Sequence, residues 1–197
     1  MFNRSLGACS MKFVSWKRAG LGTALVAIAC GAYLGGIQLT GNFAEIVPGE
    51  VYRSNQPSAQ DINYYAKIYG IRTIVNLRGA NKASWYAEEA DAARKHGIKL
   101  IDFRMSASRA LTSDQTDRLI ALLKDAPKPI LIHCKSGSDR TGLVSVIYLN
   151  RLAGIDEETA EGQLSVRFGH IGIPYLSSAY AMDQSWEELE KHFGLPS

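Results

Sequence analysis

Cys134 and Arg140 stand with five residues between them in a short segment, His133 to Gly142, that reads HCKSGSDRTG. A cysteine thiolate is a nucleophile, and the planar guanidinium of an arginine can hold two oxygens of one phosphate. An apolar run precedes the segment and a helical pattern follows it. Backbone N–H groups and the positive end of the helix dipole therefore converge on one point. Such a point favours a bound dianion with the Cys134 thiolate beneath its phosphorus.

The other residues of the segment would support attack on phosphorus. Gly137 lets the loop curl, because glycine tolerates backbone angles that other residues avoid. The hydroxyl of Thr141, directly after Arg140, is expected to donate to the Cys134 sulfur and to help it leave. The predicted phosphate-binding residues are Lys135, Ser136, Gly137, Ser138, Asp139 and Arg140.

This segment resembles the H-C-x5-R-[ST] signature of the protein tyrosine and dual-specificity phosphatase superfamily. The likeness extends to residues 47–57, 71–78 and 97–106, where the chain is similar to the atypical dual-specificity phosphatases of plants, fungi and bacteria. The resemblance implies a phosphomonoester hydrolase with a phosphocysteine intermediate, in which Cys134, Arg140 and Thr141 are catalytic. It implies neither a metal nor an organic cofactor. The implied substrate is a phosphoprotein, an acidic small molecule or a lipid phosphate.

The general acid has two candidates. In the superfamily an aspartate about thirty residues before the nucleophile supplies the proton, and Asp102 has this spacing. Asp102, however, falls inside an expected strand rather than in a mobile loop. Asp139 lies in the phosphate loop beside Arg140, which is similar to the C-x4-D-R arrangement of the myotubularins. We therefore expect the acid to be Asp139 or Asp102, with Asp139 slightly favoured over a purely structural role.

Weaker candidates surround this motif. Five basic residues at or beyond the ends of expected strands could ring the pocket or simply be solvated: Arg78, Lys82, Arg104, Arg109 and Lys135. A structural role is expected for His170, although it could approach the site. Tyr175, Tyr180 and Trp186 are expected to make core or anchor contacts, and Cys9 and Cys30 are expected to be silent.

Two other functions remain open from the residues alone. A catalytically weak pseudophosphatase could hold a phosphorylated partner, since the usual acid loop (105–109) has no carboxylate. A thiol redox or sulfur-transfer enzyme could use a similar loop. A reductase normally needs a second cysteine, and after residue 30 the sequence contains only Cys134.

Strands and helices alternate along the chain after a short polar linker over 42–49. The expected strands cover 51–54, 71–77, 98–103 and 129–133. The expected helices cover 58–69, 85–96, 112–123, 141–152, 156–168 and 178–192. This order predicts an α/β fold with a mostly parallel central sheet flanked by helices, whose ligands bind beyond the carboxyl ends of the strands.

An apolar segment precedes this domain. Residues 21–39 would form a helix of about 29 Å, long enough to cross a bilayer. The basic residues before it (Arg4, Lys12, Lys17 and Arg18) and the acidic residues after it predict a cytoplasmic N-terminus. We expect three parts: a basic cytoplasmic segment (1–18), a transmembrane anchor or signal segment (19–41) and a phosphatase domain (43–197). The domain would be periplasmic, held by a single pass of the inner membrane; cleavage near Ala29 and secretion to the periplasm is the alternative.

Composition narrows the class of protein. The 197 residues are 46% hydrophobic and 21% charged, which is typical of a folded domain and not of a disordered or disulfide-rich chain. The formal net charge of +3 comes from the N-terminal segment, so the rest of the chain is nearly neutral. A nucleic-acid partner is therefore not expected. Composition gives no information on the oligomeric state.

Overall fold

The computed structural model describes residues 16–195, so Cys9 and most of the basic N-terminal segment lie outside the described residues. Helix α1 (Trp16–Leu39) begins this part of the chain, and its window Gly22–Leu39 is long and apolar enough to cross a membrane. Cys30 lies in this helix and is exposed. The chain divides into two compact units, one ending at Gly36 and the other beginning at Ile37.

The second unit contains a five-stranded sheet in the order β1-β2-β5-β3-β4. The strands β2, β5, β3 and β4 are parallel, and β1 pairs antiparallel with β2. The bounds are Ala44–Val47 for β1, Val51–Ser54 for β2, Thr73–Asn76 for β3, Lys99–Asp102 for β4 and Ile130–His133 for β5. The expected α/β class is confirmed, with a mixed sheet. The linker expected over 42–49 is wrong, because β1 lies within it.

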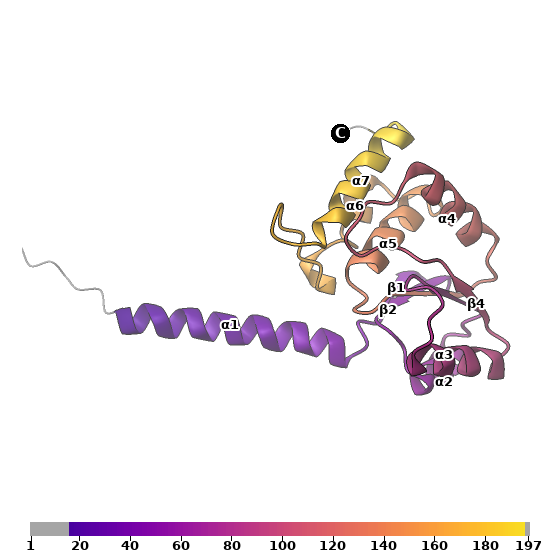
Figure 1. Ribbon diagram of the computed structural model, residues 1–197, viewed down its shortest axis with the longest axis horizontal. Helices are drawn as coiled ribbons and strands as arrows, with labels where there is room; N and C mark the ends of the chain where they lie inside the picture. The colour runs from indigo at the N-terminus through magenta and orange to yellow at the C-terminus, as the bar shows by residue number, and fades with distance from the viewer. Residues whose placement is uncertain (1–15, 196–197) are drawn as a thin grey trace, which may run out of the picture. The chain divides into compact units, whose positions relative to one another are not determined.

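Helices cover both faces of the sheet. Figure 1 shows α2 and α3 on one face and α4, α5 and α7 on the other. Their bounds are Ala59–Ile68 for α2, Ser84–Lys95 for α3, Ser113–Asp125 for α4, Asp139–Arg151 for α5, Glu157–Glu161 for α6, Val166–Phe168 for the 3₁₀ helix η1 and Tyr180–Phe193 for α7. Side chains of β5 alternate between the two cores: Ile130 and Ile132 face α4, α5 and α7, whereas Leu131 faces α2 and α3.

Local sequence fixes where several helices begin. Ser58 and Asp61 form a reciprocal capping box at the start of α2, and Thr112 and Gln115 form one at the start of α4. Helix α5 differs, because its N-cap residue Ser138 makes no side-chain hydrogen bond to the helix. The first turn of α5 therefore keeps its N–H groups available.

The helix expected over 156–168 is wrong in its second half. Helix α6 ends at Glu161, and a turn separates it from η1. The carbonyl oxygen of Gln163 accepts a hydrogen bond from Arg53 Nη1 at 2.9 Å. A Cβ at Gly142 of α5 would lie only 2.9 Å from the same oxygen. The backbone at residue 163 thus serves a tertiary contact that a continuous helix would not allow.

Candidate active site

The phosphate loop, residues 134–140, joins β5 to α5. Three of its backbone carbonyls accept hydrogen bonds from four residues between positions 38 and 56. The pairs are Gln56 N to Lys135 O (3.2 Å), Asn42 Nδ2 and Gln38 Nε2 to Ser136 O (both 3.0 Å) and Arg53 Nη2 to Gly137 O (2.6 Å). Because these carbonyls are bound from outside, the peptide planes of the loop are held in one orientation.

Most amide N–H groups of the same loop, in contrast to its carbonyls, have no hydrogen-bond partner among the described residues. Within the described part of the chain, no acceptor bonds the N–H groups of Lys135, Ser136, Gly137, Asp139 and Arg140. Partly buried N–H groups are normally paired, and the uncapped N-terminus of α5 adds its dipole. A loop with bound carbonyls and free amides can hold an anion.

Gly137 makes this curl possible. Its φ is +72°, and a Cβ there would lie 2.7 Å from the backbone of Ser54 and Asn55. Any side chain at this position therefore meets both backbone strain and a steric clash with the end of β2.

We expect Gly137→Ala to weaken binding of inorganic phosphate by about tenfold or more, because about 1–3 kcal/mol of strain and the displaced loop oppose it. Calorimetric titration of phosphate measures this. Gly154→Ala is the matched control, since Gly154 has φ +68° with nothing within 4 Å of its Cβ position. Equal losses in the two variants would contradict the role of the close approach to β2.

Cys134 and Arg140 lie at the two ends of the loop. Cys134 is buried, with 1% of its surface exposed. Arg140 is half-buried, and its Nη1 donates to Leu77 O at 3.3 Å and to Met105 O at 3.5 Å. These contacts hold the guanidinium at the carboxyl ends of β3 and β4. The structure thus brings together the sulfur, the guanidinium and the free amides in one loop.

Arg53, which sequence analysis did not single out, supports the loop from below. It is fully buried on β2 and stacks on Phe168, with its Cζ 3.8 Å from the ring centre. Its Nη2 donates to Gly137 O, and its Nη1 donates to Gln163 O. Burial lowers the pKa of Arg53 to about 9, which leaves the side chain charged at neutral pH.

A second buried chain of contacts fixes the other side of the loop. His133 Nε2 lies 2.6 Å from Glu89 Oε1 of α3, and both side chains are fully buried. Glu89 also accepts from Gln56 Nε2, and Gln56 Oε1 accepts from Arg78 Nη1. No local sequence pattern indicates Glu89, because its partner His133 is 44 residues away in the chain.

Thr141 is fully buried, and its hydroxyl has no hydrogen-bond partner among the described residues. The expected hydrogen bond to the Cys134 sulfur is therefore not made in this structure. The donor remains available in the first turn of α5.

The two candidate acids have different surroundings. Asp102, at the end of β4, accepts from Asn76 Nδ2 at 2.8 Å and from the Tyr86 hydroxyl at 2.5 Å. The hydrogen bond to Asp102, together with burial, raises the pKa of Tyr86 to about 12. Both oxygens of Asp102 are thus occupied, which fixes its side chain beside β3.

Asp139 begins α5 and contacts His170, so the structure brings His170 to the loop. His170 Nδ1 lies 2.8 Å from Asp139 Oδ1, and His170 Nε2 lies 3.0 Å from Asp183 Oδ2. Burial disfavours the charged ring, but the two carboxylates outweigh it and raise the pKa of His170. Asp139 Oδ2 has no hydrogen-bond partner among the described residues. Sequence analysis missed Asp183, which lies on α7.

Four arginines line a cavity of about 650 Å³ beside the loop: Arg78, Arg104, Arg109 and Arg140. Burial, followed by the charge of Arg140, lowers the pKa of Arg78. Of the five basic residues for which pocket lining and solvation were both open, Arg78, Arg104 and Arg109 line the cavity. Lys82 lines a separate hollow with Arg104, and Lys135 is exposed on the loop.

The three aromatic candidates differ from one another. Trp186 is buried, and its Nε1 donates to Glu161 Oε1 at 2.8 Å, as expected of a core contact. Tyr180 is half-buried at the start of α7. The core contact expected for Tyr175 is wrong, because its side chain is fully exposed, whereas the anchor contact stays a prediction.

The family model for DSP-PTPase phosphatases fused to NAD⁺ kinase matches residues 43–170, which include the whole sheet and the phosphate loop. The chain belongs to this phosphatase family. The resemblance to atypical dual-specificity phosphatases is thereby confirmed.

Curated relatives are similar over a shorter part of their own length. The inositol diphosphatase SIW14 of Saccharomyces cerevisiae is 26% identical over 153 residues, 75% of this chain and 50% of the relative. The inositol diphosphatase DSP2 of Oryza sativa subsp. japonica is 32% identical over 108 residues, 52% of this chain and 50% of the relative. The chain spans about half the length of these relatives.

Solved structures of the same kind share the fold. The structure of TpbA from P. aeruginosa has a TM-score of 0.55 at 21% identity and covers 79% of this chain and 92% of that one. The catalytic domain of SIW14 from S. cerevisiae, solved with citrate, has a TM-score of 0.58 at 22% identity and covers 79% and 94%. These structural similarities show that the chain has the expected α/β phosphatase fold.

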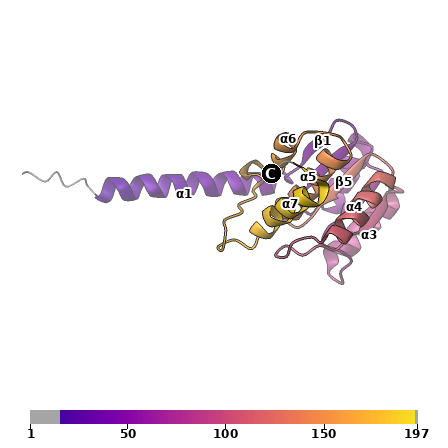
Figure 2. The ribbon, with the colours of Figure 1, turned by 90° about the horizontal axis from the view of Figure 1, so that it is seen from above.

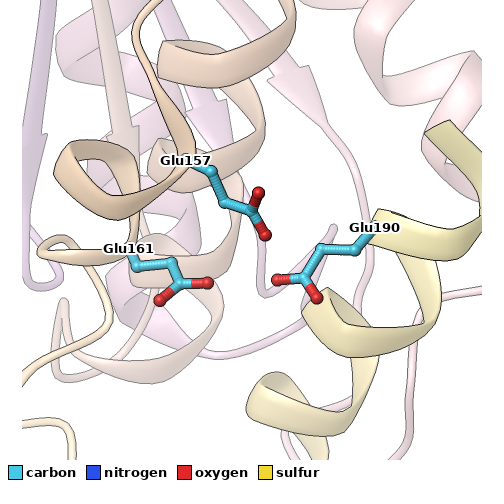
Figure 3. Close-up of side chains that lie close together, drawn as sticks. All are labelled: Glu157, Glu161 and Glu190. Carbon is cyan, nitrogen blue, oxygen red and sulfur yellow. The ribbon is translucent and has the colours of Figure 1, made fainter. Parts of the chain in front are cut away.

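Three glutamates meet between α6 and α7 in this phosphatase-family chain (Figure 3). One carboxylate oxygen from each of Glu157, Glu161 and Glu190 lies within 4.8 Å of the others. Sequence spacing did not reveal this cluster, because Glu190 is far from the other two along the chain. Burial, and then the neighbouring glutamates, raise the pKa of Glu190 to about 7.

This raised pKa predicts a pH-dependent stability. The folded state holds a proton on Glu190 that the unfolded state releases, so its contribution is full below about pH 4.5 and is lost as the pH rises through about 7. We expect the unfolding midpoint of the full chain in detergent to fall between pH 6 and pH 8, and Glu190→Gln to reduce this fall. Glu188→Gln, on the exposed side of α7, is the control and should leave this fall in the unfolding midpoint unchanged. An unchanged slope in Glu190→Gln would refute the assignment.

Proposed function

We propose that this chain is a cysteine-dependent phosphomonoester hydrolase. The Cys134 thiolate attacks phosphorus and the ester oxygen leaves, so that a phosphocysteine forms; water then attacks phosphorus and releases phosphate and the thiolate. Arg140 and the loop amides stabilise the charge on the three phosphoryl oxygens in both steps. The Thr141 hydroxyl, which has no partner among the described residues, is the donor that we assign to the departing sulfur.

One observation carries this proposal: a buried cysteine lies at the base of a loop in which three carbonyls are bound by donors from elsewhere in the chain, while five amides have no acceptor among the described residues. The family and the names of the relatives support the same reaction class. The reaction needs no metal, because the loop itself supplies the positive potential.

The direct test is turnover of p-nitrophenyl phosphate by the full chain in detergent with a chelator present. Hydrolysis under these conditions is the expected result. Activity that vanishes with chelator and returns only with a divalent ion would overturn the cysteine mechanism. Phosphate binding without turnover would indicate the pseudophosphatase, and sulfur transfer without phosphate release the thiol enzyme.

We further propose that Asp139 protonates the leaving oxygen. It stands next to Arg140, and its Oδ2 has no hydrogen-bond partner among the described residues. Its Oδ1 contacts His170, which in turn contacts Asp183. The two carboxylates raise the pKa of His170 against the opposing effect of burial, so they favour a protonated ring that can pass a proton to Asp139 after each turnover. Asp102 offers no oxygen that is free of hydrogen bonds.

Leaving groups distinguish the two aspartates. We expect Asp139→Asn to lower turnover of phenyl phosphate by about 10²-fold, and turnover of a strongly activated ester much less, because a good leaving group needs no proton. Asp102→Asn should affect both substrates alike or neither. Steady-state rates for both esters in both variants measure this, and the reverse pattern would assign the acid to Asp102.

The cavity lined by the four arginines favours a substrate that carries more than one anionic group. Arg140 serves the reacting phosphate, and Arg78, Arg104 and Arg109 are left to bind further negative charge. Phosphoproteins, inositol phosphates and lipid phosphates all carry such charge. Two relatives are named inositol diphosphatases, which fits a highly anionic substrate.

We also propose that α1 is a membrane anchor of the inner membrane and that the phosphatase unit is periplasmic. The charge asymmetry around 21–39 and the length of the apolar window support this. Cleavage before Cys30 would instead release the unit to the periplasm. A reporter active only after export, fused after Ser197, tests the orientation, and N-terminal sequencing of the mature chain tests cleavage. A reporter active only in the cytoplasm would refute the orientation.

A further inference from the structure

An exposed apolar loop lies between η1 and α7. Its residues 171–176 read IGIPYL, and no charged side chain occurs between His170 and Asp183. The side chains of Ile173, Tyr175 and Leu176 are 46%, 103% and 83% exposed. Figures 1 and 2 show this stretch projecting from the body of the phosphatase unit. A cluster of this kind on the surface marks a contact with another apolar partner.

The apolar loop starts beside both the phosphate loop and the end of the apolar helix. Asn42 Nδ2 donates to Phe168 O at 2.9 Å and to Ser136 O at 3.0 Å. Gln38 Nε2 also donates to Ser136 O. The apolar window of α1 ends at Leu39, one residue after Gln38. The chain thus leaves the proposed span within hydrogen-bond distance of the loop that binds phosphate.

We propose that the apolar loop, residues 171–176, inserts into the lipid surface from which α1 emerges, and that the enzyme hydrolyses phosphomonoesters carried by membrane lipids. The inference rests on the proposed function and on the membrane anchor. A helix anchor alone leaves the attached domain free to rotate. A second apolar contact beside the active site orients the phosphate loop toward the headgroups.

Charge near the apolar loop fits an anionic lipid surface. Lys135 on the phosphate loop and Arg167 directly before Phe168 are both exposed. The nearby carboxylates of Asp139 and Asp183 face His170. Tyrosine and aliphatic side chains next to basic residues are the composition of interfacial membrane contacts. The arginine cavity can take the second phosphate of a phospholipid whose headgroup ends in a monoester.

The test compares three substrates with the full chain in phosphatidylcholine vesicles. They are phosphatidic acid in the vesicles, dihexanoyl phosphatidic acid free in solution and p-nitrophenyl phosphate. The test variant is Ile173→Ser with Leu176→Ser. The control is Ile68→Ser with Ile155→Ser, which removes two exposed aliphatic side chains. Ile68 is the last residue of α2, before the chain enters β3, and Ile155 lies between the end of α5 and the start of α6.

We expect the test variant to lose about tenfold or more of its rate on vesicle phosphatidic acid, with the two soluble substrates and the control variant unchanged. An unchanged vesicle rate in the test variant would overturn the proposal. So would an equal loss on all three substrates, which would mean that the loop supports the fold. Hydrolysis of the soluble esters without hydrolysis of the vesicle lipid would refute the lipid substrate, whereas no hydrolysis of any ester would refute the proposed function itself.

A physical measurement separates lipid from a protein partner. Leu176→Trp in the full chain should show fluorescence quenching by brominated phosphatidylcholine beyond that of the parent protein in the same vesicles. No added quenching would mean that the apolar loop lies outside the bilayer, and would overturn the proposal.

Discussion

Cys134→Ser is expected to lower kcat for p-nitrophenyl phosphate by on the order of 10⁴-fold or more, because an un-ionised serine hydroxyl is a far weaker nucleophile than a cysteine thiolate. The free amides and Arg140 are untouched by this change. Binding of inorganic phosphate to the variant should therefore stay close to that of the parent.

The control is Cys30→Ser, which removes an exposed thiol of α1 and should leave the rate unchanged. A Cys134→Ser variant that keeps its rate would exclude the nucleophile. Loss of both rate and phosphate binding would mean that the substitution disturbs the loop, and the rate could then not be ascribed to chemistry.

Arg53→Met should destabilise the fold by about 3–5 kcal/mol. The substitution removes a fully buried guanidinium and leaves the carbonyls of Gly137 and Gln163 without donors, each at a cost of about 1–3 kcal/mol. The stacking on Phe168 is lost as well. Because Gly137 O is one of the bound carbonyls that orient the loop, phosphate affinity should also fall.

Denaturant unfolding of the full chain in detergent measures the effect, with Arg72→Met as the matched control. Arg72 is exposed at the start of β3, so its loss should change the free energy of unfolding by no more than about 0.5 kcal/mol. Arg53→Lys should lie between parent and Arg53→Met, since lysine keeps the charge but not the two-pronged donor. Equal stability of Arg53→Met and Arg72→Met would show that Arg53 does not support the loop.

The sequence predicted those parts of the site that are contiguous in the chain. Cys134, Gly137 and Arg140 lie in one loop between a buried strand and a helix, so their spacing alone indicated a phosphate loop. The alternation of apolar strands and capped helices likewise predicted the α/β fold. The strand β1 was not predicted, because its four residues gain their structure from pairing with β2.

The residues that support the phosphate loop from other elements could not be predicted from the sequence. Arg53, Glu89 and Asp183 come from β2, α3 and α7, and each meets its partner only after the chain has folded. A buried arginine, a buried glutamate and a histidine between two carboxylates leave no periodic signal in a sequence. The break after α6 has both origins: Gly162 at the C-cap of α6 is visible in the sequence, whereas the hydrogen bond from Arg53 to Gln163 O is not.

Trapping the covalent intermediate tests the central claim most directly. The full chain is mixed with p-nitrophenyl phosphate, quenched in acid during turnover, digested and examined by mass spectrometry. Our account predicts one added phosphoryl group on the peptide that contains Cys134, and none on that peptide in Cys134→Ser. Turnover with no phosphoryl group on Cys134, or with the group on another residue, would contradict it.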